Sequence, residues 1–131
     1  MQITDIKQIE TFEIACQVLG LDPEKVLPDF SSYPESDRLA MEAHSKLVII
    51  AKAANQIDND GKEWQPDWSN YDEYKYYPWF EMAGSSGFQC RVYVYWDAGS
   101  GCGSRLCFKE RSTATFIGKQ FIDTYKLYFT Y

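Results

Sequence analysis

The residue types in this chain that best suit ligand binding are tyrosines and cations that alternate with apolar residues along two short segments. These segments are 88–96 (FQCRVYVYW) and 104–109 (SRLCFK). Because side chains alternate across a strand, two strands here would present rings and cations on one face: Arg91, Tyr93, Tyr95, Arg105 and Lys109. Proteins bind single-stranded nucleic acids and nucleotides by stacking the bases on aromatic rings and by pairing cations with the phosphates. A competing interpretation is that the N-terminal helices cover this face.

A dense aromatic run at 74–80 offers a second candidate surface. Much of it must form core in so small a chain, but Tyr77 and Trp79 have the opposite strand parity from Tyr76 and Phe80. We therefore expect Tyr77 and Trp79 to contribute to a ligand cage or partner surface, since both residue types anchor interfaces.

The glycine-rich segment 97–103 directly precedes Arg105. Its backbone amides could approach an anion closely, as in anion-binding loops. No Gly-Lys-Ser/Thr follows and the segment leads toward a strand, so it matches no phosphate-loop pattern. A simple connection between strands is the competing interpretation.

Catalytic and metal-binding patterns are sparse. His44 is the single histidine, and no cysteine pair has Cys-x-x-Cys spacing. Ser/His/Asp, Cys/His and zinc arrangements therefore find no support in the spacing. We expect no enzyme activity, no metal and no cofactor, and ordinary buried thiols rather than a redox pair of Cys102 and Cys107.

The first half of the chain has helical periodicity. Residues 12–19 predict a short helix with Thr11 as N-cap and Gly20 as its end, and 35–55 predict the longest helix. The segment 22–27 predicts a single helical turn. Residues 2–9 are compatible with an edge strand or with a helical turn starting at Thr4 or Asp5.

The second half predicts a sheet and a covering helix. Strands are expected at 75–83, 88–96 and 104–109, followed by a helix at about 112–129 with Ser112 as N-cap. The connector 55–74 holds Trp64 and Trp68, which we expect to lie against the body of the protein. The predicted fold class is α+β: N-terminal helices, a three-stranded antiparallel meander, and a C-terminal helix packed on the sheet.

Length and charge narrow the function classes. The 131 residues predict a single domain, 1–131, with a helical region at residues 1–58 and an aromatic-rich region at residues 59–131. The net charge of −6 disfavours coating of duplex DNA, although residues 98–131 carry five cations against two acids. The sequence contains neither a membrane-span pattern nor a signal-peptide pattern, so we expect a cytoplasmic protein without a membrane partner.

Several motifs carry a family resemblance: Trp64-x-Pro66-Asp67-Trp68, Lys75 to Phe80, Ser86 to Phe88, Gly103 to Lys109, and Gly118 to Asp123 with Tyr125. With Leu19 to Val26 and Ala43 to Ala51, they span nearly the whole chain. In these motifs the sequence resembles a set of small uncharacterised proteins encoded by tailed bacteriophages and prophages of gut anaerobic bacteria. The resemblance implies a protein that acts inside a bacterial host cell, and it supplies no catalytic residue.

Together these features predict a non-enzymatic accessory protein of phage or prophage origin. It would bind a partner through its aromatic and basic surface, and the partner would be single-stranded nucleic acid, a nucleotide or a host protein. The alternative is a self-associating structural or virion-linked protein, because exposed tyrosines and tryptophans can form a homo-oligomer interface.

Overall fold

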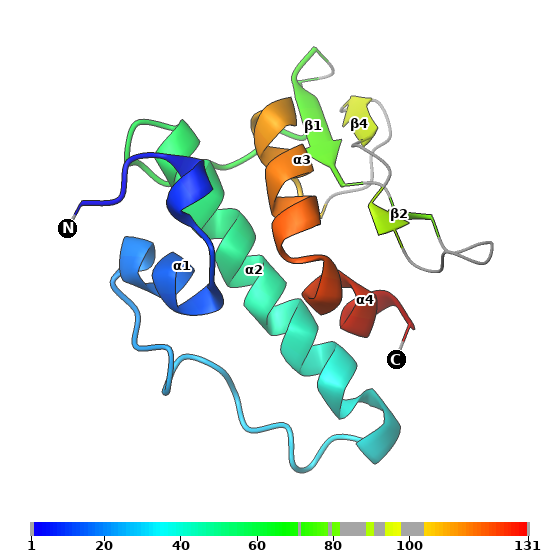
Figure 1. The fold of residues 1–131 in the computed structure, drawn as a ribbon. Helices are drawn as coiled ribbons and strands as arrows, with labels where there is room; N and C mark the ends of the chain where they lie inside the picture. Colours follow the sequence, from blue (N-terminus) through cyan, green and yellow to red (C-terminus); the bar gives the residue numbers. More distant parts are fainter. Residues whose placement is uncertain are drawn as a thin grey trace.

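The computed structural model describes residues 2–70, 72–78, 80–81, 89–90, 94–97 and 104–130, and of these it leaves the side chains of 81, 89–90, 94–97 and 130 undescribed. Over these residues the fold is mainly helical. A long helix, α2 (Arg38–Asp58), runs through the molecule (Figure 1), with α1 (Phe12–Leu19) on one side and α3 (Arg111–Gln120) and α4 (Ile122–Thr130) on the other. Two short 3-10 turns precede α1 and α2: η1 (Ile6–Gln8) and η2 (Glu35–Asp37).

Local capping explains the N-terminal elements. The Thr11 hydroxyl accepts from the Ile14 amide at 3.2 Å, and Gly20 ends α1 in the left-handed conformation at φ 70°, as predicted. The expected helix at 35–55 is confirmed as η2 followed by α2. At the N-terminus the helical alternative is correct, because Asp5 and Gln8 form a capping box around η1.

The core lies where α2 meets its neighbours. Short side chains on α2, such as Ala51 and Ala54, are fully buried and allow α1 and α4 to pack closely against it. The core draws residues from both halves of the chain: Ile9, Ala15, Leu47, Ile50, Leu106, Phe108, Ile117, Phe121 and Tyr125 among them. No helix among the residues that the structure describes is long and apolar enough to cross a membrane.

The predicted three-stranded meander is wrong. In the described residues the strands form two antiparallel pairs: β1 (Tyr74–Tyr77) with β4 (Val94–Asp97), and β2 (Phe80–Glu81) with β3 (Gln89–Cys90). The segment 104–109 is not a strand. Only Phe108 pairs with β1, through two backbone bonds to Tyr76 of 2.8 and 3.1 Å.

The prediction of one C-terminal helix packed on a sheet is also wrong. The helix breaks at Phe121 into α3 and α4, and α3 begins at Arg111 with Glu110 in the cap position rather than Ser112. The apolar side chains of Ala114, Ile117, Phe121 and Tyr125 are buried, but α4 packs on α2, whereas α3 packs against β1. Buried alanines on α2 allow α4 to pack against it. The described strands, of two to four residues, are too short to cover a helix of the predicted length.

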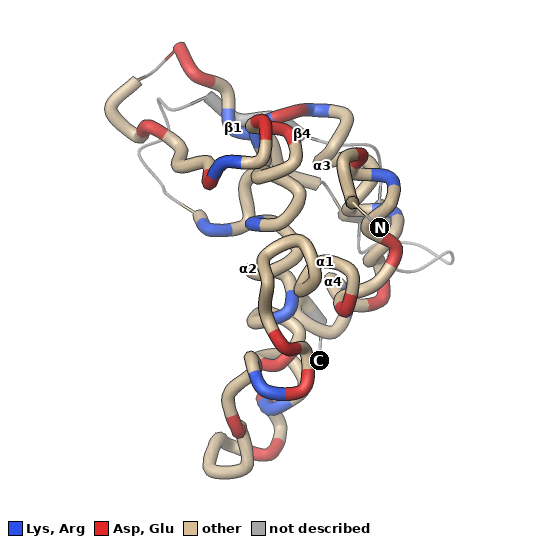
Figure 2. Tube along the Cα trace, turned by 90° about the vertical axis from the view of Figure 1, so that its left-hand side faces the viewer, with Lys and Arg blue, Asp and Glu red and all other residues tan. Residues whose placement is uncertain are grey.

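Charges are interspersed along the described elements rather than separated into two faces (Figure 2). The excess acidity belongs to residues 1–60, which hold eleven acidic and five basic side chains. Electrostatic attraction of an anion must therefore come from a local arrangement of cations.

The side chain of Asn55 ties α2 to the segment that precedes α3. Asn55 is 6% exposed; its Nδ2 donates to the Cys107 carbonyl at 2.9 Å, and its Oδ1 accepts from the Lys109 amide at 2.9 Å. One bond on each side of Phe108 orients this segment. The Phe108 ring therefore enters the core, while its backbone pairs with β1.

Replacing Asn55 by Ala should lower the free energy of unfolding by about 3 kcal/mol, because a buried carbonyl and a partly buried amide lose their partners. Denaturant unfolding measures this change. The matched control is Asn59→Ala, which also removes two bonds to backbone carbonyls, those of Lys62 and Glu63, but in surroundings exposed to water. Water replaces such bonds, so we expect less than about 1 kcal/mol for the control. Equal losses in the two variants would contradict the role assigned to Asn55.

Asp58, at the end of α2, accepts a hydrogen bond from the buried Thr113 hydroxyl in the first turn of α3. Burial raises the pKa of the Asp58 carboxyl above its ordinary value, and the nearby Glu110 adds to the rise, although the bond from Thr113 opposes it. The ionised carboxylate is thus less favourable in the folded protein than in the unfolded chain.

Because its pKa is raised in the folded protein, ionisation of Asp58 should lower the free energy of unfolding. This loss should develop as pH rises from about 4, the ordinary pKa of aspartate, through the raised pKa of Asp58 in the folded protein. Asp58→Asn keeps an oxygen acceptor for Thr113 and does not ionise. The stability of this variant relative to wild type should therefore increase with pH across that window and level off above it. Urea unfolding between pH 3.5 and 7.5, roughly the range in which carboxyls titrate, measures the difference. Asp60→Asn, on an exposed turn, is the control, and a flat difference for Asp58→Asn would refute the assignment.

Candidate functional site

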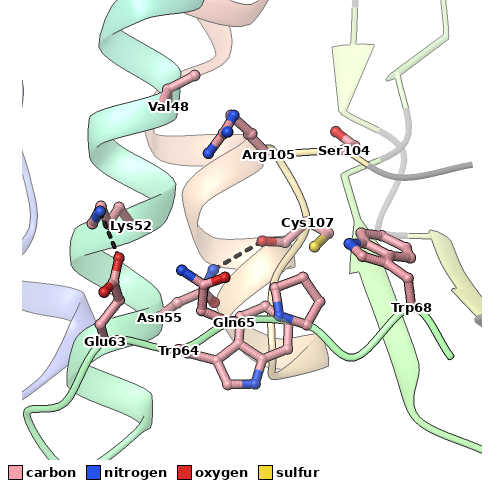
Figure 3. Close-up of a pocket in the computed structure, with 11 residues that line it drawn as sticks. Val48, Lys52, Asn55, Glu63, Trp64, Gln65, Trp68, Ser104, Arg105 and Cys107 are labelled. Atoms are coloured by element: carbon pink, nitrogen blue, oxygen red, sulfur yellow. Dashed lines mark hydrogen bonds and ion pairs between the residues drawn. The ribbon is translucent and has the colours of Figure 1, made fainter. Parts of the chain in front are cut away.

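A groove of about 400 Å³ lies between α2, the loop 63–68 and the segment 104–107 (Figure 3). This volume is within the range of small-molecule binding sites. Eleven of the described residues line it: Val48, Lys52, Asn55, Glu63, Trp64, Gln65, Pro66, Trp68, Ser104, Arg105 and Cys107. Two indoles and three ionisable groups that are charged at neutral pH thus share one concave surface.

The wall formed by α2 follows from helical spacing. Val48, Lys52 and Asn55 stand at i, i+4 and i+7, so they lie on one face of the helix. Asn55 is occupied by its bonds to the segment 107–109 and acts as a fixed floor residue. Lys52 is half exposed and forms an ion pair with Glu63, Nζ to Oε1 2.7 Å. This pair joins the helix to the tryptophan loop.

Trp68 is held in place by a buried lysine. Lys75 on β1 is 1% exposed, and its ammonium lies 5.2 Å from the centroid of the Trp68 ring. The same ammonium donates to the carbonyls of Asp67 at 2.7 Å and Asn70 at 3.2 Å, and pairs with Glu73 at 3.1 Å. These contacts offset the cost of burying the charge and fix the loop around Trp68. The prediction that this loop lies against the body is confirmed, since Trp64 and Trp68 are both half-buried.

Arg105 is the cation that the groove leaves available. It sits exposed in the turn after Ser104, and its side chain extends toward α2 in Figure 3. Among the described residues no acid pairs with its guanidinium and no acceptor bonds to it. Cys107 lies beside it as a neutral thiol, because burial raises its pKa to about 11. A planar guanidinium with free donors is well suited to a phosphate or carboxylate.

Of the residues that the sequence placed on one sheet face, the structure separates Arg105 from Lys109. Arg105 reaches the groove, whereas the Lys109 side chain pairs with Glu110 at 3.4 Å and lies outside the groove lining. Tyr77 is half-buried on β1 and also lies outside the lining. Trp79, Arg91 and Tyr93, the turn at 84–87 and the loop at 98–103 fall outside the described residues, and for Tyr95 only the backbone pairing with Tyr76 is described.

Sequence reasoning missed Trp64, Trp68, Lys52 and Glu63 as site residues. The two tryptophans stood out only as a loop that needed anchoring, and Lys52 belongs to the polar side of a helix whose apolar stripe drew attention. The available signal was the motif Trp64-x-Pro66-Asp67-Trp68, because a proline between two indoles restricts the loop and presents both rings. Nothing in the spacing connected this motif with Arg105, some forty residues later.

In the portion of the chain that the structure describes, no group of three or more metal-ligating side chains comes together. His44 lies on α2 with its ring 4.8 Å from that of Tyr128. Cys16 and Cys107 are buried free thiols.

Comparison of the chain with models of protein families, with curated proteins and with solved structures found no significant match. The resemblance to phage and prophage proteins therefore remains a prediction.

Removing the ammonium of Lys75 should loosen the wall that Trp68 forms. We expect Lys75→Met to lower the free energy of unfolding by about 2 to 3 kcal/mol, because two carbonyls and the Glu73 carboxylate lose a charged donor. Lys62→Met, at an exposed position of the preceding turn, should stay within about 0.5 kcal/mol of wild type. Denaturant unfolding measures both, and indistinguishable values would show that Lys75 does not organise this loop.

Proposed function

We propose that this protein is a non-enzymatic nucleotide-binding or single-strand-binding protein that uses the groove between α2, the tryptophan loop and Arg105. The shared chemistry of these ligands is a flat base next to a phosphate. The observation that supports the proposal is the presence of two tryptophans and an unpaired arginine in one groove of suitable size. Indoles stack on any base, and the guanidinium pairs with a phosphate oxygen.

The electrostatics favour a single strand or a free nucleotide over duplex DNA. Duplex binding requires many phosphate contacts, whereas the chain has a net charge of −6 and its charges are interspersed (Figure 2). A short segment of strand needs only one or two local cations. A host protein as the partner has less support, because the groove is concave and polar, while protein interfaces are built around a large apolar centre.

We place this activity inside a bacterial host cell, as an accessory protein of phage or prophage origin. The motifs from Trp64 to Tyr125 that resemble such proteins include two sections of the groove, Trp64 to Trp68 and Arg105 to Cys107. Phage replication exposes single strands and consumes nucleotides, so either ligand would be present there.

The test is anisotropy of a fluorescent thymidine oligonucleotide of about 12 residues, a length within the site sizes of single-strand binders. Trp64→Ala should weaken binding by about tenfold or more, because a stacked base contributes about 1 to 3 kcal/mol. Arg105→Ala should weaken it by a similar factor through loss of the phosphate contact. Thymidine 5′-monophosphate as competitor separates the two ligand sources: displacement at equal molar amounts favours a free nucleotide, and weak displacement favours a strand.

Lys119→Ala is the matched control, since it removes one exposed cation from α3, away from the groove lining. It should bind like wild type at moderate salt. An absence of binding by the wild-type protein at low salt would refute the proposal. Concentration-dependent growth in size by light scattering, without oligonucleotide binding, would instead favour the self-associating alternative.

A further inference from the structure

The charges that line the groove define how much negative charge its ligand can carry. Three of the described side chains that line the groove are charged at neutral pH: Lys52, Glu63 and Arg105. Their sum is one positive charge, since Cys107 is a neutral thiol. Neighbouring cations add little, because the Lys75 ammonium is paired with Glu73 and two carbonyls, and Lys109 is paired with Glu110.

Glu63 is the residue that keeps this sum at one. Its carboxylate lies 2.7 Å from the Lys52 ammonium, within the groove, and it would repel any anion that approached Lys52. The hydrogen bond from Lys52 lowers the pKa of the Glu63 carboxyl, so the carboxylate stays ionised across the neutral range. A ligand that competes for Lys52 still meets the Glu63 charge. Among the lining residues that the structure describes, Arg105 is then the cation that is open to a ligand.

On the basis of the proposed function, we propose that the groove binds an internal phosphodiester of a single strand, and that Glu63 sets this specificity by neutralising Lys52. A phosphodiester carries a single negative charge. A terminal phosphate monoester carries about 1.5 to 2 charges at pH 7, and a nucleoside triphosphate carries more. In the groove lining, the larger charge would face one unpaired guanidinium and one carboxylate. The volume of about 400 Å³ suits one nucleotide at a time.

The number of phosphates neutralised is measurable from the salt dependence of binding. For single strands the slope of log K against log salt is about −0.7 for each phosphate contacted. Wild type should therefore give about −0.7 with the thymidine oligonucleotide. Arg105→Gln should give a slope near zero with weak residual binding. Glu63→Gln frees Lys52 for a second contact, so it should bind more tightly, with a slope of about −1.4.

Ligand selection is a second and independent readout. Thymidylyl-thymidine, which carries one phosphodiester, should displace the oligonucleotide from wild type better than thymidine 5′-triphosphate does in the absence of magnesium. The Glu63→Gln variant should reverse or narrow this preference. Glu24→Gln, at an exposed position outside the groove lining, makes the same change in net charge and should alter neither slope nor preference. Thermal unfolding confirms that the variants are folded, since Glu63 is half exposed and its surface ion pair adds little stability.

The outcomes separate this inference from the proposed function. Two results would overturn the phosphodiester assignment and leave the binding function in place. One is tight oligonucleotide binding by wild type with a slope of log K against log salt that corresponds to two or more phosphates. The other is a preference of wild type for the triphosphate. An unchanged slope and preference in Glu63→Gln would overturn the role of Glu63. Failure of every thymidine ligand to bind would overturn the proposed function itself, and the inference with it.

Discussion

The fold depends on one buried carboxamide. Asn55 stands on the central helix at the point where the chain returns from the strands, and its two bonds to the backbone on either side of Phe108 set the course of that return. The consequence is threefold. Phe108 fills the core between α2 and the C-terminal helices, its backbone extends β1 by one bridge, and the residues just before it form one wall of the groove. An apolar residue at position 55 would also be buried, but it would not orient the segment around Phe108. Dispersion contacts lack the directionality of paired hydrogen bonds.

Lys75 has a comparable role on the other side of the groove. A lysine on a strand of this kind would ordinarily extend into water, and here it is enclosed by backbone carbonyls, a carboxylate and an indole. Each contact by itself offsets only a fraction of the desolvation of the ammonium. Together they make the loop from Asp67 to Glu73 a cage for that charge, and Trp68 is oriented as one of its walls. The groove is therefore lined by side chains whose positions are determined by two buried polar groups beneath them.

The helices were predictable because their signals are local. Thr11 and Gly20 delimit α1 through contacts within a few residues, and the spacing of apolar residues in α2 needs no partner to be recognised. The prediction failed at 104–109 and at the C-terminal helix. Alternation at 104–109 suits a strand, but a tight turn at Arg105 and the bonds to Asn55 override it. The break at Phe121, whose side chain is buried, has no proline or glycine at that position to announce it.

For the candidate site, the residue types were visible in the sequence and their grouping was not. Arg105 was identified as a ligand-binding cation, but beside tyrosines of a sheet face rather than tryptophans of a connector. By itself the sequence determined where the long helix lies and where α1 begins and ends. It also determined that the aromatic residues gather in the second half and the excess acidic residues in the first, and that Cys-x-x-Cys and Ser/His/Asp spacings are absent. Only the tertiary structure decided that Lys52, Glu63, Trp68 and Arg105 share one groove. The physical reason is that caps and periodicity act over a few residues, whereas this groove is assembled by bonds from Asn55 and Lys75 between segments that are eight to more than fifty positions apart.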